Sequence, residues 1–207
     1  MITLYDYLDS GNGYKVRLLL TQLGTDYEWT HVDLDGGESR KPAFLRRNPN
    51  GRIPTLELDD GTNLSESNAI LWYLAEGTPF VADDRLGRAQ TLQWMFFEQY
   101  DHEPYVATPR HIVKHLPPDS PRRAELPDRL KKGRAAFTVM EAHLATRKFF
   151  VGERYGIADI ALYAYTHVAH EGTHDLAPYP SLRAWLGRVA AQPRYLGITA
   201  KPKSALG

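Results

Sequence analysis

The stretch 48–76 holds the residues whose types and spacing point most directly to ligand binding. Ile53-Pro54 precedes a short alternating strand, and proline pushes the residue before it into an extended conformation. The peptide groups of Ile53 can therefore pair with a ligand that lies alongside like a short strand. Glu66-Ser67 opens a periodic helix, and a carboxylate and a hydroxyl at a helix N-terminus form a second polar site. The sequence therefore predicts a small-molecule site.

Composition restricts the partners of this chain. Its 207 residues include 25 basic and 25 acidic side chains, so the net charge indicates neither nucleic acid nor an anionic membrane as a partner. The absence of cysteine excludes disulfides, protein thiolates and cysteine-based zinc sites. The first residues do not resemble a secretory signal, and no apolar run reaches the roughly 18 residues that a membrane span needs. We therefore expect a cytoplasmic protein.

Hydrophobic periodicity predicts a mixed first part. Alternating runs predict strands at 2–5, 27–34, 54–58 and 62–64, and apolar residues at helical spacing predict helices at 16–23, 42–47 and 67–76. Gly24 is expected to end the first helix in the left-handed region. The resulting order is β-α-β-α-β-β-α, and the hairpin about Asp60-Gly61 makes the four-stranded sheet mixed. Residues 1–77 are therefore predicted to form an α/β domain.

The second part has a helical pattern throughout. The predicted helices span 86–115, 129–146, 157–170 and 181–191, and we expect Pro104 and Pro109 to kink the first of them. Residues 1–76 carry 7 basic and 12 acidic side chains, whereas 77–207 carry 18 and 13, which supports a boundary near 77. The sequence therefore predicts a linker at 78–87 and an all-α domain at 88–207. The fold class is α/β plus all-α.

Several motifs of the chain, in their order and spacing, resemble those of the cytosolic glutathione transferases. They are Asn48-Pro49-Asn50-Gly51-Arg52-Ile53-Pro54-Thr55-Leu56, Glu66-Ser67-Asn68-Ala69-Ile70 and Ile157-Ala158-Asp159-Ile160-Ala161. The first loop and helix, Ser10-Gly11-Asn12-Gly13-Tyr14-Lys15-Val16-Arg17-Leu18, is similar to that of bacterial members with Ser-x-Asn. The resemblance covers the whole chain. It implies a thioredoxin-like N-terminal domain, a C-terminal helical bundle, a homodimer, and glutathione as co-substrate without a metal.

The resemblance also implies how the stretch 48–76 holds glutathione. In the family the residue before the proline, here Ile53, pairs its backbone with the cysteinyl part of glutathione, and the Ile53-Pro54 bond is cis. Glu66 and Ser67 are implied to hold the γ-glutamyl end, with the Ser67 hydroxyl and amide facing its carboxylate. Each residue also has a purely structural interpretation: Pro54 as an edge-strand proline and Ser67 as a plain helix N-cap. The flanking motifs favour the functional interpretation.

The glycyl carboxylate of glutathione requires a cation. Lys41 is the residue that the resemblance favours, with Arg40 and Arg52 as alternatives. The competing interpretation is that these loop cations are simply solvated surface, which is the usual role of charged loop residues.

Ser10 is the residue that we assign to the chemistry of the sulfur. A thiol with a pKa of about 8.5 is mostly protonated at neutral pH, and lowering that pKa by about two units requires roughly 2.7 kcal/mol. One charge-assisted hydrogen bond plus the dipole of the first helix can supply this. Ser10 is thus predicted to stabilise a thiolate. Asn12 is the alternative donor, Tyr5 is expected to pack in its strand, and a plain N-cap is the other interpretation of Ser10.

The second substrate is expected between the two halves of the chain. Aromatic residues in the helical half suggest an apolar pocket wall, although aromatics at helical spacing more often form core. The residues assigned to this pocket are Tyr100, Tyr105 and Tyr165. Asp101 is assigned to the glutathione amine of the partner subunit in the implied homodimer.

The predicted activity is conjugation of the glutathione thiolate to an electrophilic, largely apolar acceptor. Reduction of disulfides or peroxides is an alternative, because that chemistry can run on the sulfur of glutathione itself. Family members that form a mixed disulfide on a protein cysteine are disfavoured by the lack of cysteine. A protein that binds glutathione or a hydrophobic ligand without turnover is the non-enzymatic alternative.

His170-Glu171-Gly172-Thr173-His174 matches the H-E-x-x-H motif of zinc proteases. That motif requires two imidazoles one turn apart on a continuous helix. Gly172 lies inside the motif and Pro178 follows closely, so the helix is expected to end there. We therefore interpret the motif, and the pair His111 and His115, as helix surface and assign no metal.

Asp159 is predicted to stabilise the fold and not to act as a catalytic acid. The family usually has Ser or Thr three residues before it, forming a capping box, whereas this chain has Gly156. Asp159 can still accept from the backbone amide of Gly156, with Tyr155 and Ile160 as a hydrophobic staple.

Overall fold

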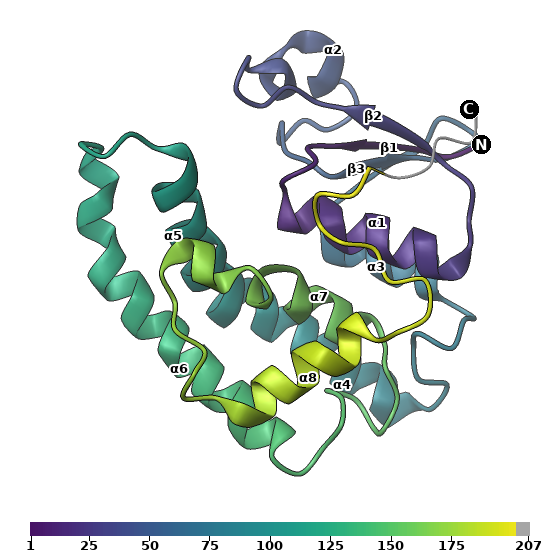
Figure 1. The fold of residues 1–207 in the computed structure, drawn as a ribbon. Coiled ribbons are helices and arrows are strands. Elements are labelled where there is room, and N and C mark those ends of the chain that lie inside the picture. Colours follow the sequence, from purple (N-terminus) through teal and green to yellow (C-terminus); the bar gives the residue numbers. More distant parts are fainter. Residues whose placement is uncertain (202–207) are drawn as a thin grey trace. The chain divides into compact units, whose positions relative to one another are not determined.

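The computed structural model describes residues 1–201, and the chain forms two compact units (Figure 1). The first unit contains 1–76 together with the segment that starts at Pro193, and the second unit contains 77–192. The boundary lies next to the end of the predicted first domain at residue 77.

A mixed four-stranded sheet forms the centre of the first unit. Its strands are β1 (Thr3–Asp6), β2 (Glu28–His31), β3 (Thr55–Glu57) and β4 (Asn63–Ser65), in the order β2-β1-β3-β4. β1 runs parallel to β2, with Leu4 opposite Trp29, and antiparallel to β3, with Leu4 opposite Leu56. β3 and β4 form the predicted antiparallel hairpin. The expected mixed sheet is confirmed.

Two helices cover one face of this sheet. They are α1 (Gly11–Leu23) and α3 (Ser67–Ala75), and Figure 1 shows them side by side. A short 3-10 helix (Glu38–Arg40) and α2 (Pro42–Leu45) connect β2 to β3. α1 ends at Gly24 with φ +72°, as predicted, because glycine adopts the left-handed conformation without a steric cost. The buried core between sheet and helices consists of Leu4, Val16, Leu20, Tyr27, Leu56 and Ile70.

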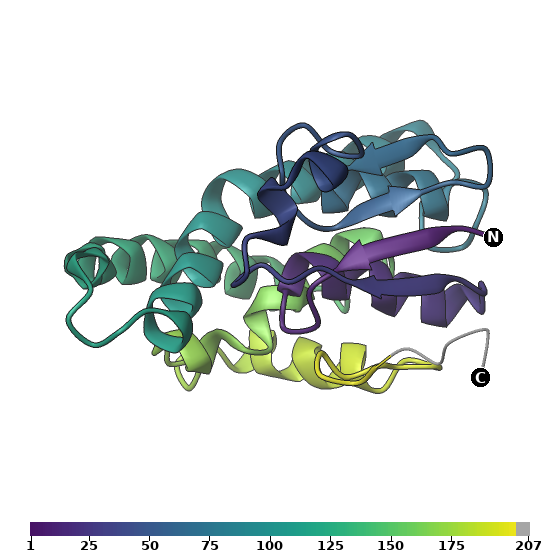
Figure 2. The same cartoon turned by 90° about the horizontal axis from the view of Figure 1, so that it is seen from above.

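The segment 193–201 returns to α1 and does not belong to the helical unit (Figure 2). The Tyr14 hydroxyl donates to the carbonyl of Leu196 at 2.7 Å. Arg17 Nη1 donates to the carbonyls of Ile198 at 2.9 Å and Ala200 at 3.3 Å. The predicted all-α range 88–207 is therefore wrong for 193–201, because buried donors of α1 draw an aperiodic segment to the first unit. Residues 202–207 of that range lie outside the described residues.

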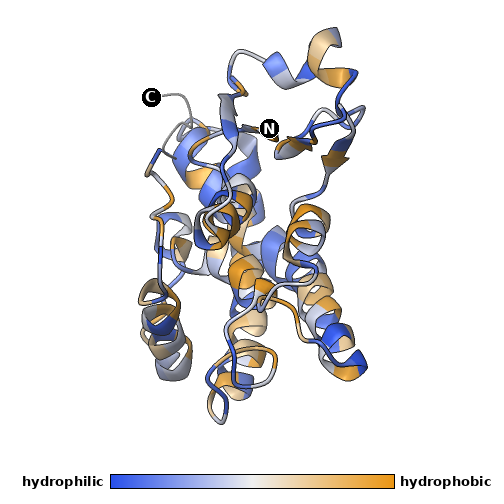
Figure 3. Cartoon of the chain, turned by 90° about the vertical axis from the view of Figure 1, so that its right-hand side faces the viewer, coloured by the Kyte–Doolittle hydropathy of each residue, from blue (hydrophilic) through white to orange (hydrophobic). Residues whose placement is uncertain are grey.

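The second unit is built from helices, as expected. They are α4 (Arg85–Phe97), α5 (Glu103–His115), α6 (Leu126–Leu144), α7 (Ile157–Thr166) and α8 (Pro180–Ala190). Figure 3 shows hydrophobic and hydrophilic residues on the same helices, which is the pattern of one packed side and one solvated side. Within 1–201 we find no helix of the length and apolar character that crossing a bilayer requires.

The predicted helix 86–115 is nearly continuous but changes its winding in the middle. A π-helical segment, Glu98–His102, joins α4 to α5. It ends two residues before Pro104, so the change in winding lies on the N-terminal side of that proline. Pro109 lies inside α5. The carboxylate of Glu98 and the ring of His102 are fully buried, and His102 Nε2 lies 2.8 Å from Thr166 Oγ1.

Asp159 joins three parts of the second unit. Its carboxylate accepts from the Gly156 amide at 3.1 Å, the Phe150 amide at 3.2 Å and Trp185 Nε1 at 2.8 Å. Burial raises the pKa of Asp159 to about 7, while these donors lower it. A Cβ on Gly156 would lie 2.6 Å from the Phe80 carbonyl oxygen. Close packing therefore explains why no hydroxyl residue occupies this cap.

The H-E-x-x-H segment does not form an α-helix. Ala169–Gly172 is a short 3-10 helix, and Thr173 has φ +67°. The Glu171 carboxylate pairs with Arg110 Nε and Lys114 Nζ, each at 2.8 Å. His174 Nε2 donates to the carbonyl of Tyr105 at 2.9 Å. The geometry that a zinc-protease helix requires is therefore absent from this segment.

His167 makes the second unit sensitive to acid. Burial lowers the pKa of His167 to about 4, with a further decrease from Arg110, against the effect of Glu171 and of the bond from Nδ1 to the Tyr163 carbonyl. The unfolded chain binds a proton on this residue at higher pH than the folded chain does. We expect the free energy of unfolding to fall by up to about 3 kcal/mol between pH 6.5 and 4 from this group.

Urea unfolding of the wild type and of His167→Phe over this pH range tests the expectation. Phe keeps a ring that can stack on Tyr163, whose centroid lies 4.5 Å from that of His167, but it cannot bind a proton. The free energy of unfolding should depend less steeply on pH in the variant, with a slope smaller by the uptake of about one proton. Equal slopes would contradict the assignment.

Candidate functional site

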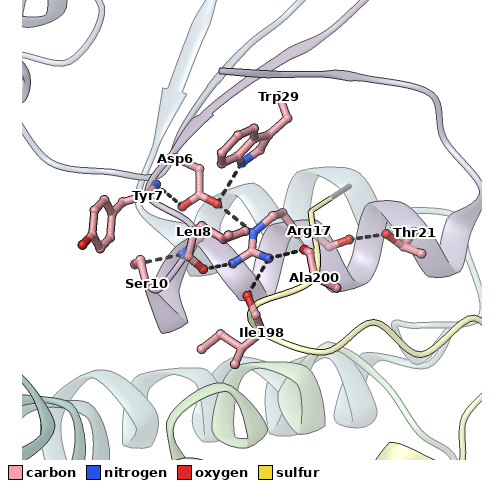
Figure 4. Close-up of polar contacts among 10 residues, drawn as sticks. Asp6, Tyr7, Leu8, Ser10, Arg17, Thr21, Trp29, Ile198 and Ala200 are labelled. Atoms are coloured by element: carbon pink, nitrogen blue, oxygen red, sulfur yellow. Dashed lines mark hydrogen bonds and ion pairs between the residues drawn. The ribbon is translucent and has the colours of Figure 1, made fainter. Parts of the chain in front are cut away.

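A fully buried ion pair lies beneath the first loop. Asp6 at the end of β1 and Arg17 in α1 meet at 2.8 Å, and both side chains have no exposed area. The other donors to the Asp6 carboxylate are the Tyr7 amide at 2.7 Å and Trp29 Nε1 at 3.3 Å (Figure 4). Burial raises the pKa of Asp6, and these donors act in the opposite direction. Buried charges of this kind require complete pairing to be tolerated.

Arg17 also holds the backbone that leads into the loop. Its Nη2 donates to the carbonyl of Leu8. The Ser10 amide donates to the carbonyl of Tyr7 at 2.8 Å, which closes a turn just before α1. The position of Ser10 therefore depends on the bond from the Arg17 side chain to the Leu8 carbonyl (Figure 4) and on the main-chain turn that the Ser10 amide closes.

Gly13 permits this close approach. A Cβ at that position would lie 1.5 Å from Asp6 Oδ1, a separation that no side chain can occupy. The carboxylate of Asp6 therefore packs directly against the backbone of the first turn of α1. The glycine of the Ser-x-Asn-Gly loop is required by this contact.

Ser10 is the N-cap of α1. It has φ −75° and ψ 124°, and its Oγ accepts from the Gly13 amide at 3.3 Å. This is the capping role that competed with the catalytic one, and the two are compatible. A hydroxyl that accepts one hydrogen bond still has its own hydrogen to donate. Ser10 is half-buried at the positive end of the α1 dipole.

Asn12 and Ser67 are brought together although they are far apart in the sequence. The Ser67 hydroxyl donates to Asn12 Oδ1 at 3.4 Å, which joins the first turn of α1 to the first residue of α3. Sequence motifs predicted both residues but not this contact, since it depends on how α1 and α3 pack.

Lys15 lies beside the predicted site residues, and sequence reasoning did not single it out. It is fully buried, and its Nζ donates to Ser67 Oγ at 3.3 Å and to Asn68 Oδ1 at 3.4 Å. A lysine within a helix is usually solvent-exposed, so the pattern gave no reason to single it out. Its spacing of three residues from Asn12, which places both on one side of the helix, was the available signal.

The N-terminus of α3 has an unusual backbone. Glu66, the residue before the helix, has φ +67° and ψ 112°, which is rare outside glycine. The first intrahelical bond runs from the Ile70 amide to the Glu66 carbonyl, so the amide of Ser67 has no acceptor within the helix. The exposed carboxylate of Glu66 and this amide lie at the positive end of α3. Such strain at a helix N-terminus is typical of ligand sites.

The Ile53-Pro54 bond is cis and lies between a braced loop and β3. Asn48 Nδ2 donates to the carbonyl of Arg52 at 2.7 Å and to Thr55 Oγ1 at 3.2 Å. The buried Asn48 side chain thus spans the proline from both sides. This arrangement holds the half-buried Ile53 at the end of the sheet.

The predicted cations have different positions. Arg40 Nη1 donates to the carbonyl of Asn50 at 2.8 Å and so braces the loop before the cis bond. Lys41 lies just before α2 and Arg52 just before Ile53, and both are exposed. The assignment of Lys41 and Arg52 to a glycyl carboxylate stays a prediction.

The residues assigned to the acceptor lie on separate elements of the second unit. Tyr100 is 75% exposed in the π-helical segment, where Asp101 is its exposed neighbour. Tyr165 is buried in α7. A cavity of about 280 Å³ adjoins Tyr105, but its other lining residues are charged: Glu125, Asp128, Arg129 and Lys132. The apolar acceptor pocket therefore stays a prediction.

Two family models match most of the chain. Residues 1–76 match the glutathione S-transferase N-terminal domain, and residues 93–193 match the C-terminal domain. Together with the thioredoxin-like sheet and the helical second unit, these matches define the class of protein. The chain belongs to the glutathione S-transferase family, as the sequence motifs indicated.

Individual relatives agree with this assignment over nearly the whole chain. The disulfide-bond oxidoreductase YfcG of Escherichia coli is 34% identical, over 93% of this chain and 92% of its own. A glutathione S-transferase of Pseudomonas fluorescens has a solved structure with 50% identity and a TM-score of 0.93, covering 96% and 99% of the two chains. A glutathione transferase of Burkholderia graminis, solved with two glutathione molecules per subunit, is 27% identical with a TM-score of 0.80, covering 93% and 85%.

Gly13→Ala should destabilise the first unit strongly. The added methyl would overlap the Asp6 carboxylate and push it from Arg17, which leaves charges of the buried pair without their partners. We expect a loss of about 3 kcal/mol or more in the free energy of unfolding. Gly187→Ala in α8 is the matched control, since a Cβ there meets nothing within 4 Å. It should be neutral or stabilising by up to about 1 kcal/mol. Urea unfolding measures both, and a Gly13→Ala protein as stable as the control would contradict the account.

Glu66→Gly and Glu66→Ala separate backbone strain from the carboxylate. Both remove the side chain, but only glycine relieves the positive φ. Glu66→Gly should therefore be more stable than Glu66→Ala by about 1 kcal/mol. If the carboxylate serves binding, both should lose retention on immobilised glutathione. Equal stabilities would show that the backbone at this position is not strained.

Proposed function

We propose that this protein is a glutathione transferase, which stabilises the glutathione thiolate for attack on an electrophilic, largely apolar acceptor. The observation that carries the proposal is the meeting of two helix N-termini in the first unit. Ser10 and Asn12 lie at the start of α1, Ser67 lies at the start of α3, and the 3.4 Å contact from Ser67 to Asn12 joins them. The N-terminus of α1 suits a sulfur anion, and the N-terminus of α3 suits a carboxylate.

The assigned residues follow the length of the tripeptide. Ser67 and Glu66 take the γ-glutamyl end, with the Ser67 amide facing the carboxylate and the Glu66 carboxylate facing the ammonium. The backbone of Ile53, before Pro54, pairs with the cysteinyl part. Lys41 and Arg52 are the cations for the glycyl carboxylate. Support comes from the braced loop around Ile53 and from the glutathione present in the Burkholderia relative.

Ser10 acts on the sulfur in this proposal. Because Ser10 Oγ accepts a hydrogen bond from the Gly13 amide, the hydroxyl hydrogen is available to donate to a sulfur in front of the N-terminus of α1. A hydrogen bond to a charged acceptor contributes about 1.5–3 kcal/mol, and the helix dipole adds up to about 1 kcal/mol. These contributions match the roughly 2.7 kcal/mol needed to lower a thiol pKa by about two units. Asn12 is the alternative donor.

The proposal also covers assembly, acceptor and location. Phe96 and Tyr100 are 60% and 75% exposed, and exposed aromatic surface of this kind favours a homodimer. Asp101 beside them is assigned to the glutathione amine of the partner subunit. The acceptor is assigned to the helical unit at Tyr100, Tyr105 and Tyr165. A cytoplasmic location fits because the cytosol holds a reduced glutathione pool.

Disulfide reduction is the second candidate function. The Escherichia coli relative is named a disulfide-bond oxidoreductase, and the Burkholderia structure holds two glutathione molecules per subunit. A first glutathione thiolate would attack the disulfide and release one thiolate. A second glutathione thiolate would then attack the mixed disulfide, release the other thiolate and form oxidised glutathione. The reaction needs no protein cysteine, and this chain has none.

Ser10→Ala should raise the pKa of bound glutathione thiol by about one to two units and lower the rate at neutral pH by about ten- to a hundredfold. Ser10→Thr keeps the hydroxyl and the cap and is the matched control. The measurements are the ultraviolet absorbance of the thiolate and the pH dependence of turnover. An unchanged thiol pKa in Ser10→Ala, together with a raised one in Asn12→Ala, would move the role to Asn12.

Turnover of three substrates decides between the candidate functions. Conjugation of an aryl halide supports the transferase, and turnover of hydroxyethyl disulfide without aryl halide supports the reductase. Retention on immobilised glutathione without turnover of aryl halide, peroxide or disulfide would indicate a binding protein instead.

A further inference from the structure

We propose that Lys15 is a positioning residue that couples the two halves of the glutathione site. It acts through a directed chain of hydrogen bonds from Lys15 Nζ to Ser67 Oγ and from Ser67 Oγ to Asn12 Oδ1. This inference rests on the proposed glutathione function, with Asn12 as a donor to the sulfur beside Ser10, and adds a residue to it. Through this chain, both the binding of the γ-glutamyl carboxylate at Ser67 and the orientation of the Asn12 side chain depend on one buried ammonium.

The chain joins residues that the fold alone brings together. Lys15 Nζ lies 3.3 Å from Ser67 Oγ, and Ser67 Oγ lies 3.4 Å from Asn12 Oδ1. Lys15 has no exposed area and Ser67 is 5% exposed, so water does not compete freely for these bonds. Asn12 is half-buried, so the chain leads from the interior to the surface of the first unit.

The direction of the chain follows from the chemistry of its members. An ammonium only donates, so Ser67 Oγ is the acceptor of Lys15. The single hydrogen of the Ser67 hydroxyl is then directed to Asn12 Oδ1, as the geometry has it. With Oδ1 accepting from Ser67, the Nδ2 group of Asn12 lies at the opposite edge of the planar amide, away from Ser67 Oγ. In this proposal Nδ2 is then the group that Asn12 offers to the sulfur as a donor.

The charge of Lys15 adds to the potential at the start of α3. The dipole of α3 already favours an anion at its N-terminus, and the buried ammonium lies behind the first residue of that helix. A charge–charge interaction is stronger in the interior than in water. An apolar residue of similar length would fill the same position without the cost of burying a charge. The carboxylate subsite depends on the charge of the ammonium, and Asn12 depends on the ammonium through the Ser67 hydroxyl.

Lys15→Met tests the coupling, because methionine is close in length but has no charge and no donor. We expect the Kd for glutathione to rise about tenfold, and the pKa of the bound thiol to rise by about one unit because Asn12 is no longer oriented. Calorimetry measures the Kd, and thiolate absorbance measures the pKa. Lys131→Met, which removes an exposed lysine from α6, controls for net charge and should change neither.

The double variant Lys15→Met, Ser67→Ala tests the path. If the chain runs through Ser67, Lys15→Met should have no further effect on the thiol pKa once Ser67 is alanine. Additive effects would overturn the proposal. A purely structural role for Lys15 would lower stability without moving the thiol pKa, and that result would also overturn it.

Ser67→Ala alone keeps the proposal testable if Lys15→Met does not fold. The variant breaks the chain but leaves Lys15 in place, and the thiol pKa should rise. An unchanged pKa would overturn the coupling but would not contradict the proposed glutathione function. Failure of the unaltered protein to bind glutathione would instead overturn the proposed function together with this inference.

Discussion

The ion pair between Asp6 and Arg17 is the interaction on which the rest of the first unit depends. It joins the end of β1 to the middle of α1, and its outer bonds hold the carbonyl of Leu8 and the segment 193–201. Because both charged groups are fully buried, each requires a full set of hydrogen-bond partners. These partners fix the backbone conformation around the pair. The loop that carries Ser10 is one of the segments fixed in this way.

A second constraint brings the functional groups into range of each other. The core between the sheet and the helices packs α1 against α3, so the N-termini of the two helices share one region of the first unit. Ser67 then reaches Asn12, and Lys15 lies beneath both. The proposed sulfur subsite and carboxylate subsite thus lie in the same small region, as a ligand that carries both groups requires, and this is the physical basis of the proposed glutathione site.

Much of this arrangement could be predicted from residues whose local chemistry is distinctive. The mixed sheet followed from strand and helix periodicity, and Gly24 and the Asp159 cap followed from known helix-end chemistry. The segment 193–201 was assigned to the wrong unit, because it has no periodicity and is held by Tyr14 and Arg17 from another part of the chain. Lys15 was missed because a buried lysine looks like an exposed one until its neighbours are known. The acceptor residues Tyr100, Tyr105 and Tyr165 stay predictions.

The sequence by itself determined the family, the order of elements and the motifs at the helix N-termini, since these depend on residues close together in the chain. Only the tertiary structure decided which of those motifs meet. The contact from Ser67 to Asn12 and the burial of Lys15 depend on packing between α1 and α3. The residues in contact are far apart in the sequence, with 52 positions between Lys15 and Ser67 and 55 between Asn12 and Ser67. Local propensity does not specify such contacts, because they form only when a common core holds both helices in place.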